Sequence, residues 1–184
     1  FVMFLIATVC VMWVEFQIHS TLPLHLTSLG FSPATYGMLL SINGIMIVLF
    51  ELALTNVTTR YRPQPIIALG YGLAAIGFCL TGFAFTLPAL AATVVVWTIG
   101  EMIYAPVTGV YVTNLAPERY RGRYNGMWMQ MWSVAMILGP AMGTWIYSRN
   151  PNALWIACAV MGAAGATLPL LSLSEARKQQ HSRG

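Results

Sequence analysis

The sequence contains very little charge. Of its 184 residues only 8% are charged, whereas 58% are hydrophobic, and the mean hydropathy is +0.70. A soluble domain carries about 25% charged residues, so this composition excludes an ordinary soluble domain and indicates a membrane protein with several spans. The net charge of +4 does not predict a nucleic-acid partner, because the basic residues lie in short gaps between apolar runs.

Cysteine is also scarce, and the common catalytic motifs are missing. Cys10, Cys79 and Cys158 lie singly in apolar segments without CxxC spacing, which predicts neither a disulfide framework nor a zinc site. The sequence has no HExxH and no glycine-rich loop with a Walker lysine. We therefore expect no metal, no cofactor and no enzyme activity. The chain opens at Phe1 inside an apolar run, so we expect it to be part of a longer protein.

Six apolar segments are long enough to cross a bilayer, which takes roughly 20 helical residues. None alternates with period two, so the predicted fold is an all-α membrane protein with six transmembrane helices. We expect a bundle over residues 1–172 and a polar tail over 173–184. The predicted segments are 1–22, 33–56, 65–84, 88–114, 124–147 and 153–172.

Basic residues cluster in alternate connections. The first and third connections contain no Lys or Arg, and Arg149 is the exception on their side. By the positive-inside rule, both ends of the chain and the second and fourth connections are predicted to be cytoplasmic. This predicts a multi-pass integral membrane protein in contact with the lipid bilayer. The arginines of the second and fourth connections are Arg60, Arg62, Arg119, Arg121 and Arg123.

Small residues and prolines mark the expected packing and bending of the helices. Small residues at helical spacing, such as Gly70, Ala74 and Gly77, favour close helix packing in lipid. Pro106 and Pro140 fall inside predicted helices, where each removes a backbone hydrogen bond and is expected to bend the helix.

Three glutamates, Glu15, Glu51 and Glu101, lie inside predicted spans, yet no Lys or Arg lies at the same depth. A carboxylate in hydrocarbon costs a few kcal/mol, so intramembrane acids usually mark a functional site. Each of these must be protonated, hydrogen-bonded, hydrated or paired with a cation from outside the chain.

Glu101 belongs to a polar stripe on its helix. Steps of three and four residues place it on one face with an indole, two phenols and a hydroxyl, whereas the opposite face is apolar. We expect this face to line a cavity; a purely structural polar seam is the alternative. The stripe consists of Trp97, Glu101, Tyr104, Thr108 and Tyr111.

The first two predicted helices offer further candidates. Glu15 and His19 share a stripe, which predicts a second protonatable group in the cavity, unless Glu15 is hydrated at the outer interface. Gln17 is turned away from them. On the second helix, Asn43 is the better candidate for ligand contact, because Glu51 is near enough to the cytoplasmic end to snorkel or to pair with a loop arginine. Trp132 on the fifth predicted helix is a weaker candidate for the interior.

Two stretches resemble a known family. The run GEMIYAPVTGVYVTNLAPERYRGRYNG (100–126), followed by GPAMG (139–143), resembles the tenth and eleventh transmembrane segments of the major facilitator superfamily, particularly its drug and solute antiporters. Similar patterns occur in its proton-coupled peptide branch. The resemblance implies the carboxy-terminal half of a transporter, built as two inverted three-helix repeats whose first helices, here the first and fourth, line the cavity.

The same resemblance implies a function. We expect alternating-access export of a small organic solute or drug, energised by the proton gradient, with the amino-terminal half as partner and a bacterial inner membrane as location. It also implies that the basic loops act as cytoplasmic gates, although the run 56–62 lacks the acidic residue of the family's loop motif. The alternatives are a proton symporter or facilitator that imports a sugar, peptide or metabolite, and a non-transporting membrane scaffold or intramembrane enzyme.

Overall fold

The computed structural model describes residues 1–181, with side chains to residue 171. Residues 182–184, the end of the predicted polar tail, lie outside the described chain. The described residues form helices and contain no strand, as predicted for an all-α protein. In chain order the elements are α1 (Val2–Glu15), the 3-10 helix η1 (Phe16–His19), α2 (Thr21–Ser28), α3 (Pro33–Thr58), α4 (Pro63–Thr81), α5 (Leu87–Leu115), the 3-10 helix η2 (Glu118–Tyr120), α6 (Arg121–Arg149) and α7 (Pro151–His181).

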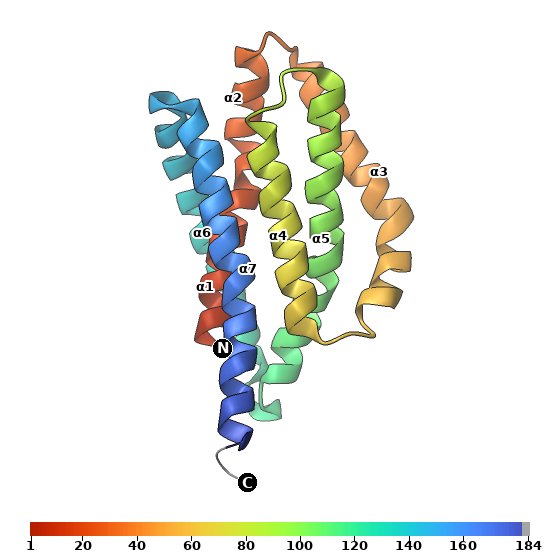
Figure 1. The fold of residues 1–184 in the computed structure, drawn as a ribbon, viewed down its shortest axis with the longest axis vertical. Helices are drawn as coiled ribbons and strands as arrows, with labels where there is room; N and C mark the ends of the chain where they lie inside the picture. Colours follow the sequence, from red (N-terminus) through yellow and green to blue (C-terminus); the bar gives the residue numbers. More distant parts are fainter. Residues whose placement is uncertain (182–184) are drawn as a thin grey trace.

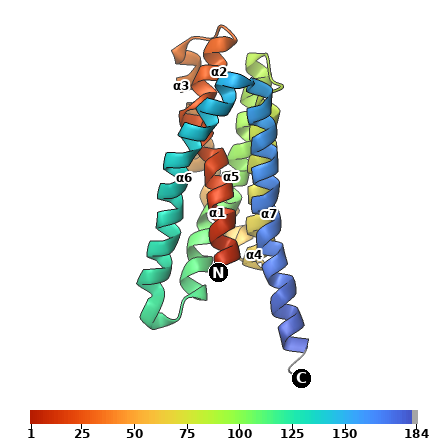
Figure 2. The same cartoon turned by 90° about the vertical axis from the view of Figure 1, so that its left-hand side faces the viewer.

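The helices run up and down along one long axis (Figures 1 and 2). The α3–α4 and α5–α6 connections lie at the end toward which both termini point, and the α2–α3, α4–α5 and α6–α7 connections lie at the other end. The connections that carry the arginine clusters therefore share one end of the molecule.

Five of the described segments are long and apolar enough to cross a membrane: Val2–His19, Pro33–Thr58, Pro63–Thr81, Leu87–Leu115 and Pro151–Leu171. Helix α6 has sufficient length with 29 residues, but it is less apolar. Its sequence mixes methionines with glycine, serine, glutamine and tyrosine, and it has arginines at both ends. A sixth span and the two-repeat organisation therefore remain predictions.

The boundaries differ from the predicted ones in three places, one of which is α7, where the helix continues past the predicted end at residue 172 to His181. The predicted first segment, 1–22, is divided by the 3-10 helix η1 and continues as α2 to Ser28. The predicted connection from Pro23 is thus largely helical, because proline is tolerated in the first turn of a helix, where its missing N–H has no partner to lose. Arg121 and Arg123 lie in the first turn of α6 rather than in a loop.

Helices α4 and α5 approach closely at glycines. A Cβ atom on Gly70 would lie 2.7 Å from the Tyr104 Cβ and 2.8 Å from the Gly100 carbonyl oxygen. A Cβ atom on Gly77 would lie 2.6 Å from the Trp97 Cβ. Small residues therefore allow the two backbones to touch, as the sequence predicts for α4. Because Glu101 follows Gly100, this contact fixes the position of Glu101 along the long axis of the bundle.

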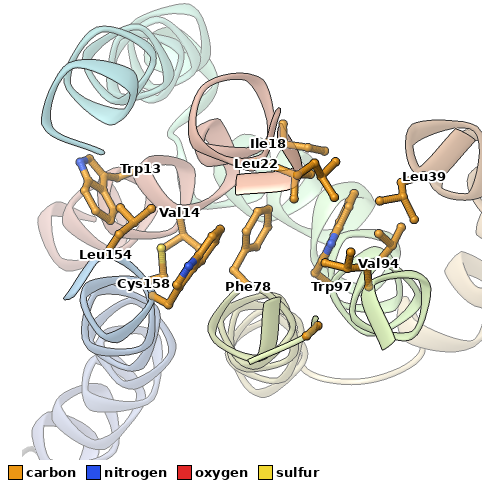
Figure 3. Packing of buried hydrophobic residues seen from close by; sticks show 14 residues of the cluster. Trp13, Val14, Ile18, Leu22, Leu39, Phe78, Val94, Trp97, Leu154 and Cys158 are labelled. Atoms are coloured by element: carbon orange, nitrogen blue, oxygen red, sulfur yellow. The ribbon is translucent and has the colours of Figure 1, made fainter. Parts of the chain in front are cut away.

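Two buried hydrophobic clusters occupy the two ends of the bundle. In the first, Trp97 of α5 stacks on Phe78 of α4 with ring centroids 5.3 Å apart, and Trp13 and Leu154 belong to the same cluster (Figure 3). The second cluster includes Phe4 and other residues of α1, α4, α5 and α6. The polar site described below lies along the side of these clusters.

Helices α3 and α6 are the least covered. Within the described chain, α3 buries only Leu39 and Thr58, and α6 buries only Ala135, Gly139 and Gly143. Helix α3 lies at one edge of the molecule in Figure 1, and α6 lies at an edge in Figure 2. The helices α5 and α6 continue through Pro106 and Pro140; the predicted bends remain predictions.

Candidate functional site

A polar pocket of about 260 Å³ lies where α1 and η1 face α3, α5 and α6. Glu15 and Glu101 both line it, as do Asn43, Tyr104 and His19. Five of the eight predicted cavity residues are thus brought together. The remaining lining is apolar or aromatic: Met12, Phe16, Ile18, Leu40 and Trp132.

Glu101 is held by an amide from the neighbouring helix. Asn43 Nδ2 donates hydrogen bonds to Glu101 Oε2 at 2.9 Å and to Thr98 Oγ1 at 3.1 Å. Both the neutral and the ionised carboxyl can accept an amide N–H, so this contact orients Glu101 in either state. The bond also connects α3 to the centre of α5.

Glu15 has a different environment in the same pocket. Its Oε1 is buried and has no hydrogen-bond partner within the described chain. Glu15 lies near enough to Glu101 and Tyr104 to interact with both. The indole N–H of Trp132, which also lines the pocket, is likewise without an acceptor in the described residues. Two residues of the pocket wall therefore carry buried polar atoms, an acceptor and a donor, that only a ligand or water brought close to them would satisfy.

The chemistry of the pocket follows from its charges. Two carboxyl groups line it, and no Lys or Arg does so among the described residues. Such a site can bind and release protons or hold a cation, because each needs a negative or neutralisable acceptor. An anionic ligand would meet two acids without a counter-charge. The mixture of methionine and aromatic side chains suits an amphipathic ligand.

The remaining stripe residues of α5 do not reach the pocket. Trp97 is 1% exposed and packs on Phe78, so it belongs to the core rather than to a cavity wall. Thr108 is 2% exposed and its hydroxyl donates to the Ala105 carbonyl at 2.9 Å. The Tyr111 ring packs edge-on against Phe4 at 5.1 Å. Trp97, Thr108 and Tyr111 therefore do not line this pocket, and their place in a transport cavity remains a prediction.

Residues of η1 shape the pocket in a way that the helical pattern did not predict. Phe16, Ile18 and His19 all line it, and His19 is exposed there. Residues three apart are eclipsed in a 3-10 helix, so Phe16 lies in line with His19, whereas in an α-helix the two would be about 60° apart. Gln17 points elsewhere, as predicted.

Glu51 lies outside this pocket. It is partly buried on α3, and in the described chain it forms no ion pair with Arg60 or Arg62. It is nevertheless near enough to Glu101 to interact with it electrostatically. Pairing with a loop arginine, one of the two alternatives for Glu51, is therefore absent in this conformation.

The predicted gate arginines are exposed at one end of the molecule. Arg119 and Arg123 lie 5.9 and 5.4 Å from the centre of the Tyr120 ring, within the range of cation–π contacts. Arg121 is 3.8 Å from Glu118. Arg60 lies in the turn that follows α3, and Arg62 is the residue immediately before α4. Their role as gates remains a prediction.

Comparison with known proteins agrees with the fold. Residues 4–183 match the Major Facilitator Superfamily. An uncharacterized MFS-type transporter of Bacillus subtilis, YttB, is 27% identical over 134 residues, which is 71% of this chain and 34% of that protein. The class H tetracycline resistance protein of Pasteurella multocida is 27% identical over 152 residues, which is 79% of this chain and 36% of that protein.

A solved structure shows the same arrangement of helices. The crystal structure of a POT family transporter in complex with a thioalcohol-conjugated peptide superposes with a TM-score of 0.76 over 97% of this chain and 40% of that one, at 17% identity. The chain thus spans about a third of the length of the curated relatives that it matches. With nearly all of its residues matched by the family, this chain is an integral membrane protein that belongs to the Major Facilitator Superfamily of transporters.

Proposed function

We propose that this chain is the carboxy-terminal half of a secondary transporter that exports a small organic solute or drug in exchange for protons. The observation that carries the proposal is the pocket in which Glu15 and Glu101 meet without a basic side chain among the described residues. A carboxyl that exchanges its proton for a cationic or hydrogen-bonding ligand couples the two fluxes, because it cannot hold both at once.

The two acids are suited to different tasks. Glu101 already accepts a hydrogen bond from Asn43, so its orientation is fixed. Glu15 Oε1 lacks a partner in the described chain and is free to meet a ligand or a proton. In this proposal Glu101 carries the coupling proton or the charge of the cargo, Tyr104 stands beside both acids, and Glu15 completes the site.

The pocket also explains why a second half is needed. A site for a drug-sized ligand usually occupies about 300–1,000 Å³ and covers most of the ligand, whereas this pocket measures about 260 Å³. Helices α3 and α6, which border it, leave most of their apolar surface uncovered. In the proposed transporter the amino-terminal half closes the pocket and covers these faces, and the two halves rock about the site.

Export is favoured over uptake by one comparison. A relative covering 79% of this chain is named for tetracycline resistance. The likeness to the POT family transporter concerns the fold alone, so import of a peptide is the second candidate only on that analogy.

The direction of coupling is tested with the full-length transporter in proteoliposomes, using tetracycline and ethidium as probes. In antiport, protons leave the acidic side of the membrane, so the probe should move toward that side. Reversing the pH gradient should reverse the flux of the probe. Movement of the probe together with protons would indicate symport. Flux that ignores both gradients would contradict proton coupling.

A further inference from the structure

The two acids of the pocket each keep an oxygen without a hydrogen-bond donor. Glu15 Oε1 is buried and accepts no hydrogen bond within the described chain. Glu101 uses Oε2 for the bond from Asn43, which leaves its Oε1 without a donor among the described residues. An ionised carboxylate accepts hydrogen bonds and donates none. Both acids can therefore take a hydrogen bond from a donor that is brought into the pocket.

Asn43 adds a further acceptor, because both of its amide hydrogens are already used. Its Nδ2 donates to Glu101 Oε2 at 2.9 Å and to Thr98 Oγ1 at 3.1 Å. A side-chain amide has only two hydrogens, so Asn43 has none left for a ligand. Its Oδ1 accepts no hydrogen bond in the described part of the chain. This oxygen is what Asn43 can present to a ligand in the pocket that it lines.

Hydrogen-bond donors are fewer in the same lining. The indole N–H of Trp132 is buried without an acceptor among the described residues. Tyr104 lies near enough to Glu15 to interact with it, so its hydroxyl has an acceptor close by. A neutral His19 adds one donor and one acceptor. No Lys or Arg of the described chain lines the pocket. The lining therefore needs more donors than it supplies.

We propose that the cargo is an ammonium ion that carries N–H donors, a protonated primary or secondary amine, rather than a quaternary cation. The inference rests on the proposed function, because it takes this pocket as the transport site. Each carboxyl there exchanges a proton for the cargo, and an N–H group bonds to the oxygen lone pair that the proton leaves. A quaternary ammonium neutralises the charge but gives no hydrogen bond to that oxygen or to Asn43 Oδ1.

The apolar part of the lining bears on the rest of the cargo. It consists of Met12, Phe16, Ile18 and Leu40. A short aryl or alkyl group attached to the ammonium can contact these side chains within a pocket of about 260 Å³. Aromatic side chains also attract quaternary ammonium ions through cation–π contacts. Recognition by aromatic faces and recognition by acceptor oxygens therefore predict opposite orders of affinity, which an experiment can separate.

The test compares four probes of equal charge that differ in their N–H donors: 2-phenylethylammonium and its N-methyl, N,N-dimethyl and N,N,N-trimethyl derivatives. Binding to the purified full-length transporter is measured by isothermal titration calorimetry at pH 8, where all four are cations. We expect Kd to rise across the series and to be about tenfold or more higher for the trimethyl than for the primary ammonium, because charge-assisted hydrogen bonds are lost. Each methyl group adds apolar surface, so hydrophobic binding alone predicts the opposite order.

Glu15→Gln tests whether the discrimination arises in this pocket. The substitution keeps the length of the side chain, removes its charge and replaces one acceptor oxygen with an NH₂ donor. The ratio of the trimethyl Kd to the primary Kd should fall to about threefold or less, because a neutral amide makes the weaker hydrogen bond. Glu51→Gln is the matched control and should keep the parental ratio, since Glu51 lies in a membrane span but does not line the pocket.

Equal Kd values for the four probes, tighter binding of the trimethyl probe, or no binding of any probe to the parent would overturn the inference. A parental ratio in Glu15→Gln would also overturn it. The titration needs neither transport nor a proton gradient. Binding in the expected order without proton-driven flux of any substrate would therefore contradict the proposed function and leave the cargo class intact. Proton-driven flux of ethidium without a preference among the four amines would do the reverse.

Discussion

The side-chain amide of Asn43 on α3 lies 2.9 Å from the carboxyl oxygen Oε2 of Glu101 on α5. Helix α3 is otherwise poorly covered in the described chain, so this contact is a polar link between an outer helix and the pocket. A change of protonation or ligation at Glu101 alters the acceptor of that hydrogen bond. The carboxyl is therefore placed to influence the position of α3.

Asn43→Leu should weaken both transport and folding. The substitution removes the donor to Glu101 and Thr98 in a low-dielectric setting, where interhelical hydrogen bonds contribute about 0.6–2 kcal/mol. The free energy of unfolding, measured by titration of the full-length protein with SDS, should fall by this amount. Asn114→Leu, at an exposed position of α5, is the control. Equal stability and transport in the two variants would show that the Asn43 bond is unimportant.

Gly70→Ala should destabilise the contact between α4 and α5. The added methyl group would lie 2.7 Å from the Tyr104 Cβ and 2.8 Å from the Gly100 carbonyl, so the helices must separate. Such overpacking costs about 1–3 kcal/mol, and it also shifts Glu101 and Tyr104. Thermal unfolding in detergent should show a lower midpoint than in Gly44→Ala, whose Cβ meets no atom within 4 Å. An unchanged midpoint would contradict the close packing.

Water should reach the pocket, which Leu40 of α3 lines, but not Thr108 on the α5 stripe. Leu40 lines the pocket, whereas Thr108 is buried outside it. In a background without native cysteines, a charged thiol reagent should label Leu40→Cys several times faster than Thr108→Cys. Equal rates would mean that the wet face extends along the whole stripe, as the sequence pattern alone predicts.

Stability should fall at acidic pH because of His25, which lies in α2 beyond the first membrane span. Burial lowers the pKa of His25, and the Thr81 backbone opposes part of this shift. The neutral ring bonds to Tyr147 through Nδ1 at 3.1 Å. Since the unfolded chain then binds a proton more readily than the folded one, stability is complete above the unfolded pKa of about 6.5 and is lost as pH falls toward the folded value.

The measurement for His25 is the unfolding midpoint between pH 8 and pH 5 in the full-length protein and in His25→Asn. The parent should lose more stability than the variant across the acidic half of this range. Parallel curves would indicate that His25 does not titrate with folding.

The sequence predicted the helices and the meeting of the two acids more successfully than the full outline of the site. Apolar length and the small residues of α4 identify spans and close contacts, because both are local properties of the chain. Glu15, Glu101 and Asn43 stand out because a polar group in lipid needs a partner. These residues do line one pocket in the structure.

Other features depend on tertiary contacts that no helical pattern records. Trp97 and Thr108 share a face of α5 with Glu101. Neighbouring side chains nevertheless bury both of them, on either side of the turn that carries Glu101. The break at η1 changes the phase of the first span, so Phe16 and Ile18 enter the pocket against the expected periodicity. The sequence signal that bears on this break is Gln17, a buried amide opposite the Gly139–Gly143 pair.

The central claim, that the pocket carboxyls couple transport to protons, is tested most directly by Glu101→Gln in the full-length transporter. The substitution keeps the hydrogen-bonding shape of the side chain and removes its exchangeable charge. Glu51→Gln is the matched control, because Glu51 also lies in a membrane span but does not line the pocket. In proteoliposomes with an imposed pH gradient and ethidium as probe, we predict that Glu101→Gln abolishes proton-driven flux at parental protein levels, whereas Glu51→Gln retains it. Parental proton-driven flux in Glu101→Gln would contradict the account.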